Sequence, residues 1–324
     1  MRALICNEYG PADTLDFEDR KIPTPGKGEV TVDVRAAAIN FPDALVIAGK
    51  YQVKTPPPFI PGSECAGLVR EVGEGVNHVK PGDRVIALPE GGAYAEVCCV
   101  PAMRVIPIGP KMSFTDAAGF TITYGTSYHA FKQSARLAEG ETVLVLGAAG
   151  GVGITAVELA KVMGARVIAA ASTDEKLAFA REAGADETIN YSSENLKERV
   201  KELTDGAGAD VVYDPVGGTL AIEALKATAW HGRYLVIGFA SGDIPNLPAN
   251  LALLKEASIV GVWWGTWLAK DPKAGQENMM ELLRMAGSGK LKPRVTEVFA
   301  IEDYADAFAQ VTERRAKGKV IMKL

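Results

Sequence analysis

The feature that most constrains the fold is a strand followed by a glycine-rich turn and a helix in the middle of the chain. Residues 142–147, TVLVLG, are typical of a buried strand, and the turn GAAGGVG leads into a run with the apolar spacing of a helix. Apolar strands then alternate with helical stretches of roughly 10 to 15 residues as far as YLVIG at 234–238. This alternation predicts an α/β fold, a doubly wound parallel sheet with helices on both faces.

Roughly the first 120 residues have a different rhythm. Short β-type runs are separated there by clusters such as PTPGKG and TPPPFIPG, which predicts a β-rich, barrel-like domain. After residue 265 the chain reads helix, strand, helix, strand and no longer follows the βα alternation. We therefore expect a discontinuous domain, residues 1–123 and 266–324, around an inserted α/β domain, residues 124–265. A length of 324 residues agrees with two domains, since single cores rarely grow beyond roughly 250 to 300 residues.

Composition and charge argue against several classes of protein. The 40 acidic and 35 basic residues are spread along the chain without a basic run, so a nucleic-acid partner is not expected. The N-terminus has no signal-peptide core, and no uncharged stretch reaches the roughly 20 residues of a membrane span. The four cysteines match neither a disulfide framework nor a Cys-x-x-Cys pair. We expect a cytoplasmic protein that binds neither membranes nor nucleic acids.

The glycine turn matches a dinucleotide-binding fingerprint. In that fingerprint the first glycine makes the turn, the second lets the backbone approach a pyrophosphate, and the third lets the helix pack on the strand. Here the three positions are Ala148, Gly150 and Gly153, and we expect Gly147 and Gly151 to absorb the strain of the alanine. An ordinary strand-to-helix turn is the competing interpretation. The context favours a pyrophosphate at the helix N-terminus, bound by Ala149, Gly150, Gly151, Val152 and Gly153.

The second strand of this series ends without an acid. A site for NAD has an Asp or Glu about 20 residues beyond the turn, where it binds the ribose 2′-hydroxyl. Alanines occupy residues 169–171, and Ser172 and Lys176 follow with a hydroxyl and a cation, which favours NADP(H). Ser172 is equally suited to cap the next helix together with Glu175, the two roles being compatible, and Lys176 to be a solvated helix residue. Tyr191 either flanks the adenosine or is an ordinary aromatic residue at a strand end.

Several motifs resemble those of one family over essentially the whole chain. They are AINFPDALVIAGKY from residue 38, PFIPGSECAGLVREVGEGV, KPGDRV, GAAGGVG, VVYDPVGG, VIGFASG and the terminal GKVIMKL. The chain resembles the zinc-free quinone oxidoreductases, or zeta-crystallin-like proteins, of the medium-chain dehydrogenase/reductase superfamily. The resemblance implies a GroES-like N-terminal barrel, a Rossmann domain that binds NADPH, and reduction of quinones or activated alkenes by hydride transfer.

The residues that bind zinc in metal-dependent relatives are replaced in this chain. Those relatives have a Cys after the third strand and a Gly-His-Glu in the next segment, whereas this chain has Asn40 and Gly62-Ser63-Glu64. The cysteine cluster of the structural zinc is absent as well, and tetrahedral zinc needs about four N, S or O ligands. No metal is therefore expected. Without a metal Lewis acid the acceptor has to be electrophilic already, as quinones and conjugated enones are.

By resemblance, four residues line the space near the nicotinamide and the substrate: Asn40, Asp43, Tyr51 and Thr123. Asn40 would bind a substrate oxygen or the carboxamide of the cofactor. Tyr51 would donate a proton or only shape the pocket. Asp43 has a competing role as a first-turn residue of a helix that follows Pro42. The resemblance also implies contacts with the cofactor at the ends of later strands, namely at Gly217, Gly238, Phe239, Ala240 and Ser241.

The segment SIVGVWWGTW, with Trp263, Trp264 and Trp267, resembles the last strand of the Rossmann sheet, which in this family pairs across a twofold axis. A buried core strand would have the same composition, but an exposed edge needs cover, and we expect a homodimer. The predicted function is an NADPH-dependent quinone reductase. The alternatives are an NADPH-dependent reductase of alkenal, enone or acyl-CoA-type double bonds, and an NADPH-binding crystallin-like or sensing protein with little turnover.

Overall fold

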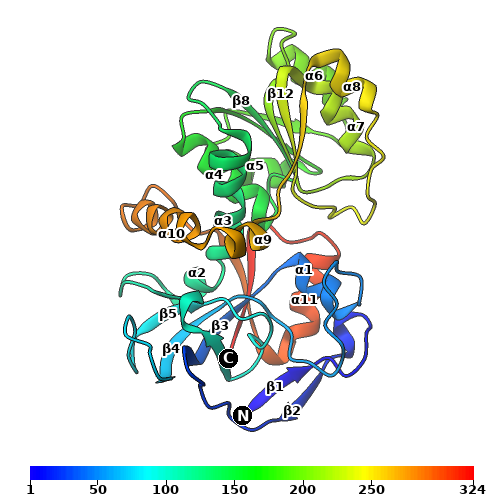
Figure 1. Ribbon diagram of the computed structural model, residues 1–324. Helices are drawn as coiled ribbons and strands as arrows, with labels where there is room; N and C mark the ends of the chain where they lie inside the picture. Colours follow the sequence, from blue (N-terminus) through cyan, green and yellow to red (C-terminus); the bar gives the residue numbers. More distant parts are fainter. The chain divides into compact units, whose positions relative to one another are not determined.

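The structure, a computed structural model that describes residues 1–324, divides into two compact units (Figure 1). Unit 1 comprises Met1–Ile122 and Pro293–Leu324, and unit 2 comprises Thr123–Lys292. The chain therefore leaves unit 1 and returns to it, and both termini lie in unit 1. The expected return at residue 266 is too early, because two further helices pack within unit 2.

Unit 1 is built on a seven-stranded sheet in which β3 is the central and longest strand. The order along the sheet is β14-β15-β3-β4-β5-β7, β6 also pairs with β3, and β1 and β2 form a small sheet of their own. The Pro and Gly clusters fall between these short strands, as the sequence predicts. The bounds are β1 (Arg2–Ile5), β2 (Asp16–Asp19), β3 (Glu29–Ile39), β4 (Cys65–Val72), β5 (Arg84–Ala87), β6 (Val97–Pro101), β7 (Val105–Pro107), β14 (Val295–Ala300) and β15 (Lys319–Lys323).

The core of unit 1 lies between this sheet and a C-terminal helix. Val30, Val32 and Val34 lie on one face of β3 and are buried in this core. Phe308 of the helix packs edge-to-face on Tyr94, with ring centroids 5.9 Å apart. The helices of unit 1 are α1 (Phe41–Ile47), α2 (Phe114–Ala118), α11 (Tyr304–Thr312) and the 3₁₀ turns η1 (Ala12–Thr14), η2 (Ala102–Arg104) and η4 (Ile301–Asp303).

Unit 2 contains the predicted doubly wound sheet. Its six strands are all parallel, in the order β10-β9-β8-β11-β12-β13, which is the Rossmann arrangement. Leucine, isoleucine, valine and alanine side chains bury the strands on both faces, as expected of a parallel sheet. The bounds are β8 (Thr142–Leu146), β9 (Arg166–Ala171), β10 (Glu187–Asn190), β11 (Ala209–Asp214), β12 (Thr228–Val236) and β13 (Ser258–Gly261).

Helices cover both faces of the unit 2 sheet. In Figure 1, α4 and α5 lie on one side, and α6, α7 and α8 lie on the other. The second group packs on Leu144, Leu146 and Ile168 of the central strands. The helices of unit 2 are α3 (Thr121–His129, which begins at the boundary), the π-helical turn η3 (Ala130–Ala135), α4 (Gly151–Val162), α5 (Asp174–Glu182), α6 (Leu196–Leu203), α7 (Gly218–Ala227), α8 (Ala249–Lys255), α9 (Trp264–Lys270) and α10 (Pro272–Gly287).

Helices α9 and α10 belong to unit 2 because their side chains pack on α3 and η3. The ring of Trp267 stacks on His129 with centroids 4.1 Å apart, and Trp264 packs against Gly125, where a side chain would collide with its ring. Gln133 of η3 donates to Asn278 of α10 at 3.1 Å. The prediction that SIVGVWWGTW is one strand is therefore wrong in its second half. Strand β13 ends at Gly261, and tryptophan packing on α3 favours a helix beyond it.

None of the helices combines the length with the apolar character that a bilayer-spanning segment requires. All four cysteines are free thiols. The sulfurs of Cys65 and Cys98 lie 3.7 Å apart in the core of unit 1 without a bond between them.

The contact between α4 and β8 generates the first prediction. A Cβ added at Gly153 would lie 2.2 Å from the carbonyl oxygen of Gly147, which is backbone and cannot rotate away. We expect Gly153→Ala to lower the free energy of unfolding by about 1–3 kcal/mol, the usual cost of overpacking. Gly265→Ala in α9 is the matched control, because nothing lies within 4 Å of its added Cβ. Urea unfolding of both variants is the measurement, and a Gly153→Ala protein as stable as the control would contradict the packing argument.

Candidate functional site

The glycine turn between β8 and α4 has the shape that an anion site requires. Gly147 takes a positive φ of 55°, and Gly150 is the N-cap of α4 without any side-chain cap. The first backbone N–H groups of α4 therefore have no side chain to accept their hydrogen bonds, and the helix dipole adds positive charge at the same place. Of the predicted residues, Ala149 and Gly150 lie in this turn, and Gly151, Val152 and Gly153 form the first turn of α4. Of the two glycines expected to absorb strain, Gly147 does so and Gly151 is already helical.

The end of β9 carries no carboxylate, as the sequence predicts, but the helix that follows is capped differently. Thr173 is the N-cap of α5, and its hydroxyl accepts the Lys176 N–H at 3.3 Å. The expectation that Ser172 caps this helix is wrong, because the helix begins one residue later than the Ser-x-x-Glu pattern implies. The half-buried Ser172 uses its carbonyl to accept from Ser192 at 2.9 Å, and its hydroxyl makes no hydrogen bond within the chain.

The first turn of α5 carries two acidic residues, which add negative charge just beyond the end of β9. Asp174 accepts a hydrogen bond from the Asn190 side chain at 2.8 Å, and Glu175 is the next residue. Tyr191 lies nearby in the same region, because its N–H donates to the carbonyl of Ala171 at 3.1 Å. The predicted residues Ser172, Lys176 and Tyr191 thus lie around the carboxyl end of β9.

The loops that follow β11 and β12 lie side by side, and the β11 loop touches the glycine turn. The N–H of Ser241 donates to the carbonyl of Val216 at 2.8 Å, and the N–H of Ala240 donates to that of Pro215 at 3.0 Å. Val216 in turn packs on Gly147, where an added Cβ would lie 2.9 Å from its methyl carbon. The structure therefore brings together three strand ends at the carboxyl edge of the sheet, where open α/β folds bind ligands.

A buried acid that the sequence analysis did not single out shapes the β11 loop. Asp214 accepts the backbone N–H groups of Val216 at 2.7 Å and Gly217 at 2.9 Å, and Tyr234 donates its hydroxyl to the same carboxylate. Burial raises the pKa of Asp214, while these three donors oppose that rise. Gly217 itself has φ 69°, which glycine adopts without strain. The signal in the sequence was an acid three residues before a Gly-Gly pair, in DPVGG.

In unit 1, Asp43 is a buried residue that accepts three hydrogen bonds. It lies in the first turn of α1 and accepts the N–H of Asn40 at 2.8 Å, the hydroxyl of Ser63 at 2.8 Å and the hydroxyl of Tyr94 at 3.0 Å. Burial raises the pKa of Asp43, and the three donors work against that rise. The competing role as a helix-start residue is thus the one that its contacts support.

Asn40 lies between two buried charged side chains, Glu64 and Lys319, that the sequence analysis did not assign to the site. Lys319 donates to Asn40 Oδ1 at 2.7 Å, and Asn40 Nδ2 donates to Glu64 Oε2 at 3.3 Å. The Lys319 ammonium is 3.7 Å from the same Glu64 oxygen, and the other Glu64 oxygen accepts the Ile122 N–H at 2.8 Å. Burial raises the pKa of Glu64 and lowers that of Lys319, against their mutual attraction. The signals were charges within the apolar segments GSECAG and GKVIMKL.

The other two predicted catalytic residues have simpler surroundings. Tyr51 follows α1 in unit 1 and is half-buried, and its N–H donates to Leu45 at 3.1 Å. Its hydroxyl makes no hydrogen bond within the chain. Thr123 lies in α3 of unit 2 and is buried, and its carbonyl accepts the hydroxyl of Thr155 at 3.2 Å. Only Asn40 and Asp43 of the four predicted residues are directly bonded to each other.

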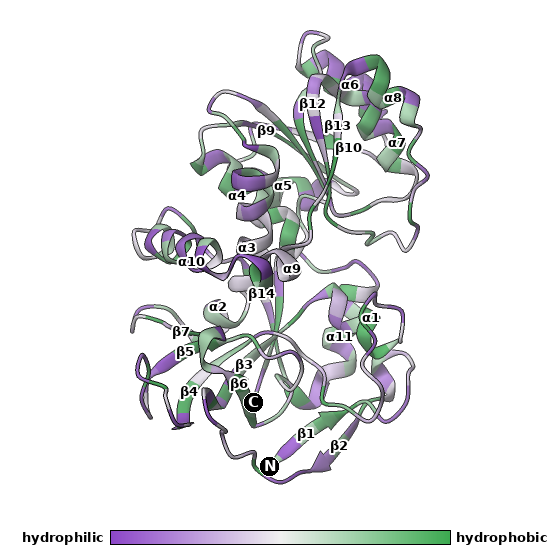
Figure 2. Ribbon diagram, in the orientation of Figure 1, coloured by the Kyte–Doolittle hydropathy of each residue, from purple (hydrophilic) through white to green (hydrophobic).

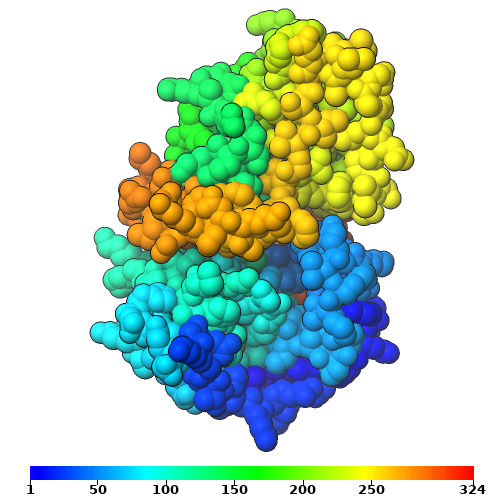
Figure 3. All heavy atoms as spheres, viewed as in Figure 1, coloured from blue at the N-terminus to red at the C-terminus, as the bar shows by residue number.

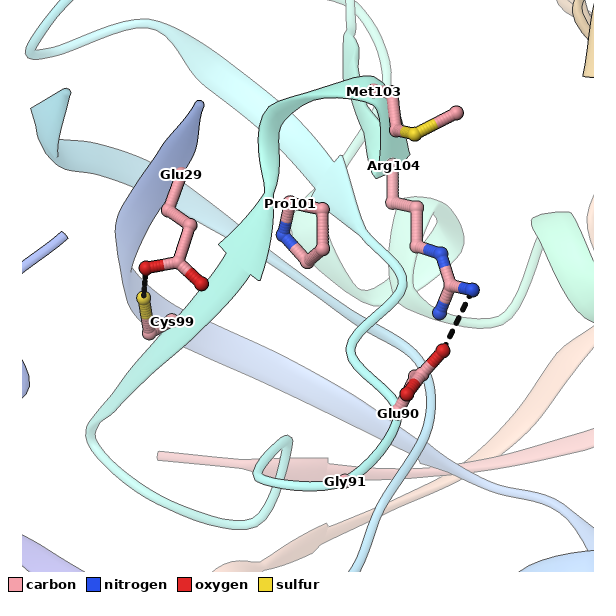
Figure 4. A pocket seen from close by; sticks show the side chains of 7 residues that line it. All are labelled: Glu29, Glu90, Gly91, Cys99, Pro101, Met103 and Arg104. Carbon is pink, nitrogen blue, oxygen red and sulfur yellow. Dashed lines mark hydrogen bonds and ion pairs between the residues drawn. The ribbon is translucent and has the colours of Figure 1, made fainter. Parts of the chain in front are cut away.

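Two further features concern metal binding and a hollow in unit 1. No group of three or more His, Cys, Asp or Glu side chains has a geometry that could hold a metal ion. A hollow of about 390 Å³ occurs in unit 1, and Figure 4 shows its lining from β3, β6 and the following turn. Its Glu90 pairs with Arg104 at 2.8 Å, and its Cys99 donates to Glu29 at 3.6 Å. It contains none of the predicted site residues.

Comparison with known proteins identifies relatives over the full length. Residues 26–110 match the family "Alcohol dehydrogenase GroES-like domain", and residues 151–285 match "Zinc-binding dehydrogenase". The chain is 43% identical to quinone oxidoreductase-like protein 2 homolog of Nematostella vectensis, covering 99% of this chain and 88% of the relative. It is 35% identical to quinone oxidoreductase of Pseudomonas aeruginosa, covering 97% of both. The crystal structure of Escherichia coli quinone oxidoreductase complexed with NADPH is similar with a TM-score of 0.94 and 29% identity, covering 100% of both chains.

The capping difference at α5 generates the second prediction. Thr173→Ala removes the side-chain acceptor of the first turn, and we expect it to lower the free energy of unfolding by about 1 kcal/mol. Ser172→Ala is the neighbouring control and should change that free energy by less than about 0.5 kcal/mol, because its hydroxyl bonds to nothing in the chain. Chemical denaturation compares the two. A larger loss for Ser172→Ala would restore the original capping interpretation.

Proposed function

Because the chain belongs to the zinc-free, quinone oxidoreductase-type branch of the medium-chain dehydrogenase/reductase family, we propose that it reduces a quinone with NADPH and without a metal ion. The observation that carries the choice of cofactor is the carboxyl end of β9. Alanines end that strand, and the free hydroxyl of Ser172 follows them. An acid at this place would repel a 2′-phosphate, whereas a serine hydroxyl donates to it.

The residues of unit 2 fit a dinucleotide with a 2′-phosphate. The uncapped N-terminus of α4 suits a pyrophosphate, and the Gly150 backbone leaves room for its close approach. Ser172 and Lys176 would hold the 2′-phosphate, and Tyr191 would flank the adenosine. Gly217 and the residues from Gly238 to Ser241 would line the path toward the nicotinamide. When bound, reduced nicotinamide supplies a hydride at C4, and the protein supplies binding, orientation and exclusion of water.

The side chains of unit 1 limit the kind of acceptor. Asp43 and Glu64 are buried and already bonded, so neither is a free general acid. The hydroxyl of Tyr51 has no partner in the chain, and we assign to it the delivery of a proton or the shaping of the pocket. The residues that replace the zinc ligands, Asn40 and Ser63, bond to neighbouring side chains. An acceptor that is already electrophilic suits this set, and a quinone is the first choice.

A panel of acceptors tests the proposed reaction. We expect purified protein to oxidise NADPH when a benzoquinone is added. The loss of NADPH absorbance at 340 nm measures the rate. Short 2-alkenals, cyclic enones and an enoyl-CoA form the second arm. Activity confined to the alkenes would overturn the quinone assignment in favour of a double-bond reductase, with the same cofactor site. Tight NADPH binding without oxidation in either arm would favour a crystallin-like or sensing role.

The 2′-phosphate site is tested by paired variants. We expect Ser172→Ala and Lys176→Ala to weaken NADPH binding, each by about 1.5–3 kcal/mol for a hydrogen bond to a charged group, and to leave NADH binding nearly unchanged. Lys197→Ala in α6 is the control for loss of a lysine from a helix of the same unit. Dissociation constants from fluorescence titration give the comparison. Equal losses for both nucleotides would mean that neither residue contacts a 2′-phosphate.

We also propose that the protein forms a homodimer through the edge of the unit 2 sheet. Strand β13 is the last strand of that sheet and has a neighbour on one side only. Exposed apolar residues lie around it, and in Figure 2 helix α8 is largely green, the colour of hydrophobic residues. The yellow atoms of this region form an outer surface of unit 2 in Figure 3. The exposed residues are Leu253 (77%), Leu254 (68%), Trp263 (53%) and Ile259 (40%).

The oligomeric state follows from the mass in solution. Analytical ultracentrifugation of the wild type should give twice the chain mass of 34.3 kDa. Ile259→Lys places a charge on the β13 edge and should shift the mass toward that of the monomer. Met103→Lys, at an apolar residue of unit 1 that is 76% exposed, controls for the added charge and should remain dimeric. A monomeric wild type would contradict the proposed dimer.

A further inference from the structure

The register of three neighbouring strands brings together a buried polar triad of Asn40, Glu64 and Lys319. Strand β15 pairs with β3 so that Val320 lies opposite Ile39, and β3 pairs with β4 so that Ala37 lies opposite Cys65. The residues next to these pairs are Lys319, Asn40 and Glu64. Their exposed fractions are 5%, 6% and 0%, so the triad lies within unit 1 and away from bulk water.

The two charges determine which way the carboxamide of Asn40 faces. An ammonium group can only donate hydrogen bonds, and a carboxylate can only accept them. Lys319 therefore takes the oxygen of Asn40 at 2.7 Å, and Glu64 takes its nitrogen at 3.3 Å. A rotated carboxamide would place donor against donor and acceptor against acceptor. The orientation of Asn40 is thus set by its chemical surroundings.

This orientation leaves one donor without a partner in the protein. The nitrogen of Asn40 carries two hydrogens, and Glu64 binds one of them. The Asn40 nitrogen donates no second hydrogen bond within the chain, and Asn40 is 6% exposed. A nearly buried donor without an acceptor is costly, and such groups in native proteins call for a ligand or a water molecule to bind them.

Stability alone does not account for the ion pair. Removing an ammonium and a carboxylate from water costs several kcal/mol each, and apolar residues of similar size often serve as well or better. Positioning of a neighbouring group is a role that apolar residues cannot fill. Lys319 and Glu64 can fill this role, because both bind the carboxamide of Asn40.

We propose that Lys319 and Glu64 are positioning residues that hold Asn40 as an N–H donor toward the carbonyl oxygen of the acceptor. This inference rests on the proposed reduction of a quinone or enone. A quinone that accepts hydride from reduced nicotinamide becomes a hydroquinone anion, and a proton from water then completes the two-electron reduction. The negative charge develops on a carbonyl oxygen. A donor that is already fixed in place stabilises that charge without reorganisation.

Kinetics of Lys319→Met provide the first test. We expect kcat with a benzoquinone to fall about tenfold or more, because the carboxamide is no longer held in one orientation. The dissociation constant of NADPH should stay within about twofold, since Lys319 acts through Asn40 on the acceptor and not on the cofactor. Lys323→Met is the matched control, a lysine on the same strand that is exposed, and it should behave as the wild type. An unchanged kcat, or a loss of NADPH affinity that matches the loss of kcat, would overturn the proposal.

A double-mutant cycle separates positioning from general loss of structure. Asn40→Ala removes the donor itself and should lower kcat by about 100-fold. If Lys319 acts through Asn40, then Lys319→Met adds little further loss on the Asn40→Ala background, and the two effects are strongly non-additive. Losses that multiply would show that Lys319 acts elsewhere. If Lys319→Met does not fold, a double variant that combines Lys319→Met with Glu64→Gln replaces it in the cycle. The double variant removes both charges.

A spectroscopic readout does not depend on turnover. In protein labelled with ¹⁵N-asparagine, the Asn40 side-chain NH₂ pair is the pair that disappears in Asn40→Ala. We expect this pair to shift in Lys319→Met and to stay in place in Lys323→Met. Absence of any shift in Lys319→Met would refute the fixed carboxamide even if the wild type reduces quinones. A wild type without reductase activity but with the expected shift would instead refute the proposed function and leave the positioning intact.

Discussion

A backbone contact that only glycine permits holds the β8–α4 turn in its shape. Gly153 approaches the carbonyl of Gly147 so closely that an added Cβ would lie 2.2 Å from the oxygen. The N-terminus of α4 is thereby kept against the end of β8, and Gly147 in turn packs on Val216 from the β11 loop. The edge of the sheet where three loops meet depends on this contact. The anion site that we propose at that edge depends on close backbone packing, because side chains would fill the same space.

Unit 1 holds part of its interior in place by a different means, a network of buried hydrogen bonds and an ion pair. Asp43 accepts three hydrogen bonds, and Glu64 and Lys319 share the carboxamide of Asn40. Low polarity in a protein interior makes each unpaired polar atom costly and each paired one rigid. Such a network constrains positions more tightly than apolar packing does. Asn40 and Ser63, which stand where metal-dependent relatives have zinc ligands, are accordingly held by hydrogen bonds to neighbouring side chains.

Much of the fold follows from local patterns in the sequence. The alternation from β8 through α4 to β12 and the Pro and Gly clusters of unit 1 depend on near neighbours, and the structure contains these elements. The helical character of Trp264 and Trp267 was not predictable, because it depends on packing against Gly125 and His129. The triad of Asn40, Glu64 and Lys319 depends on the pairing of strands far apart in the chain. The cap of α5 differed by one residue, within the usual spread of helix ends.

The central claim of this account is electrostatic: the carboxyl end of β9 admits a 2′-phosphate because no carboxylate ends that strand. Isothermal titration of the wild-type protein with NADPH and with NADH, at about 0.15 M salt, tests it most directly. The account predicts that NADPH binds at least about tenfold more tightly, since a single charge-assisted contact contributes that much. Binding of NADH as tight as that of NADPH, or tighter, would contradict it.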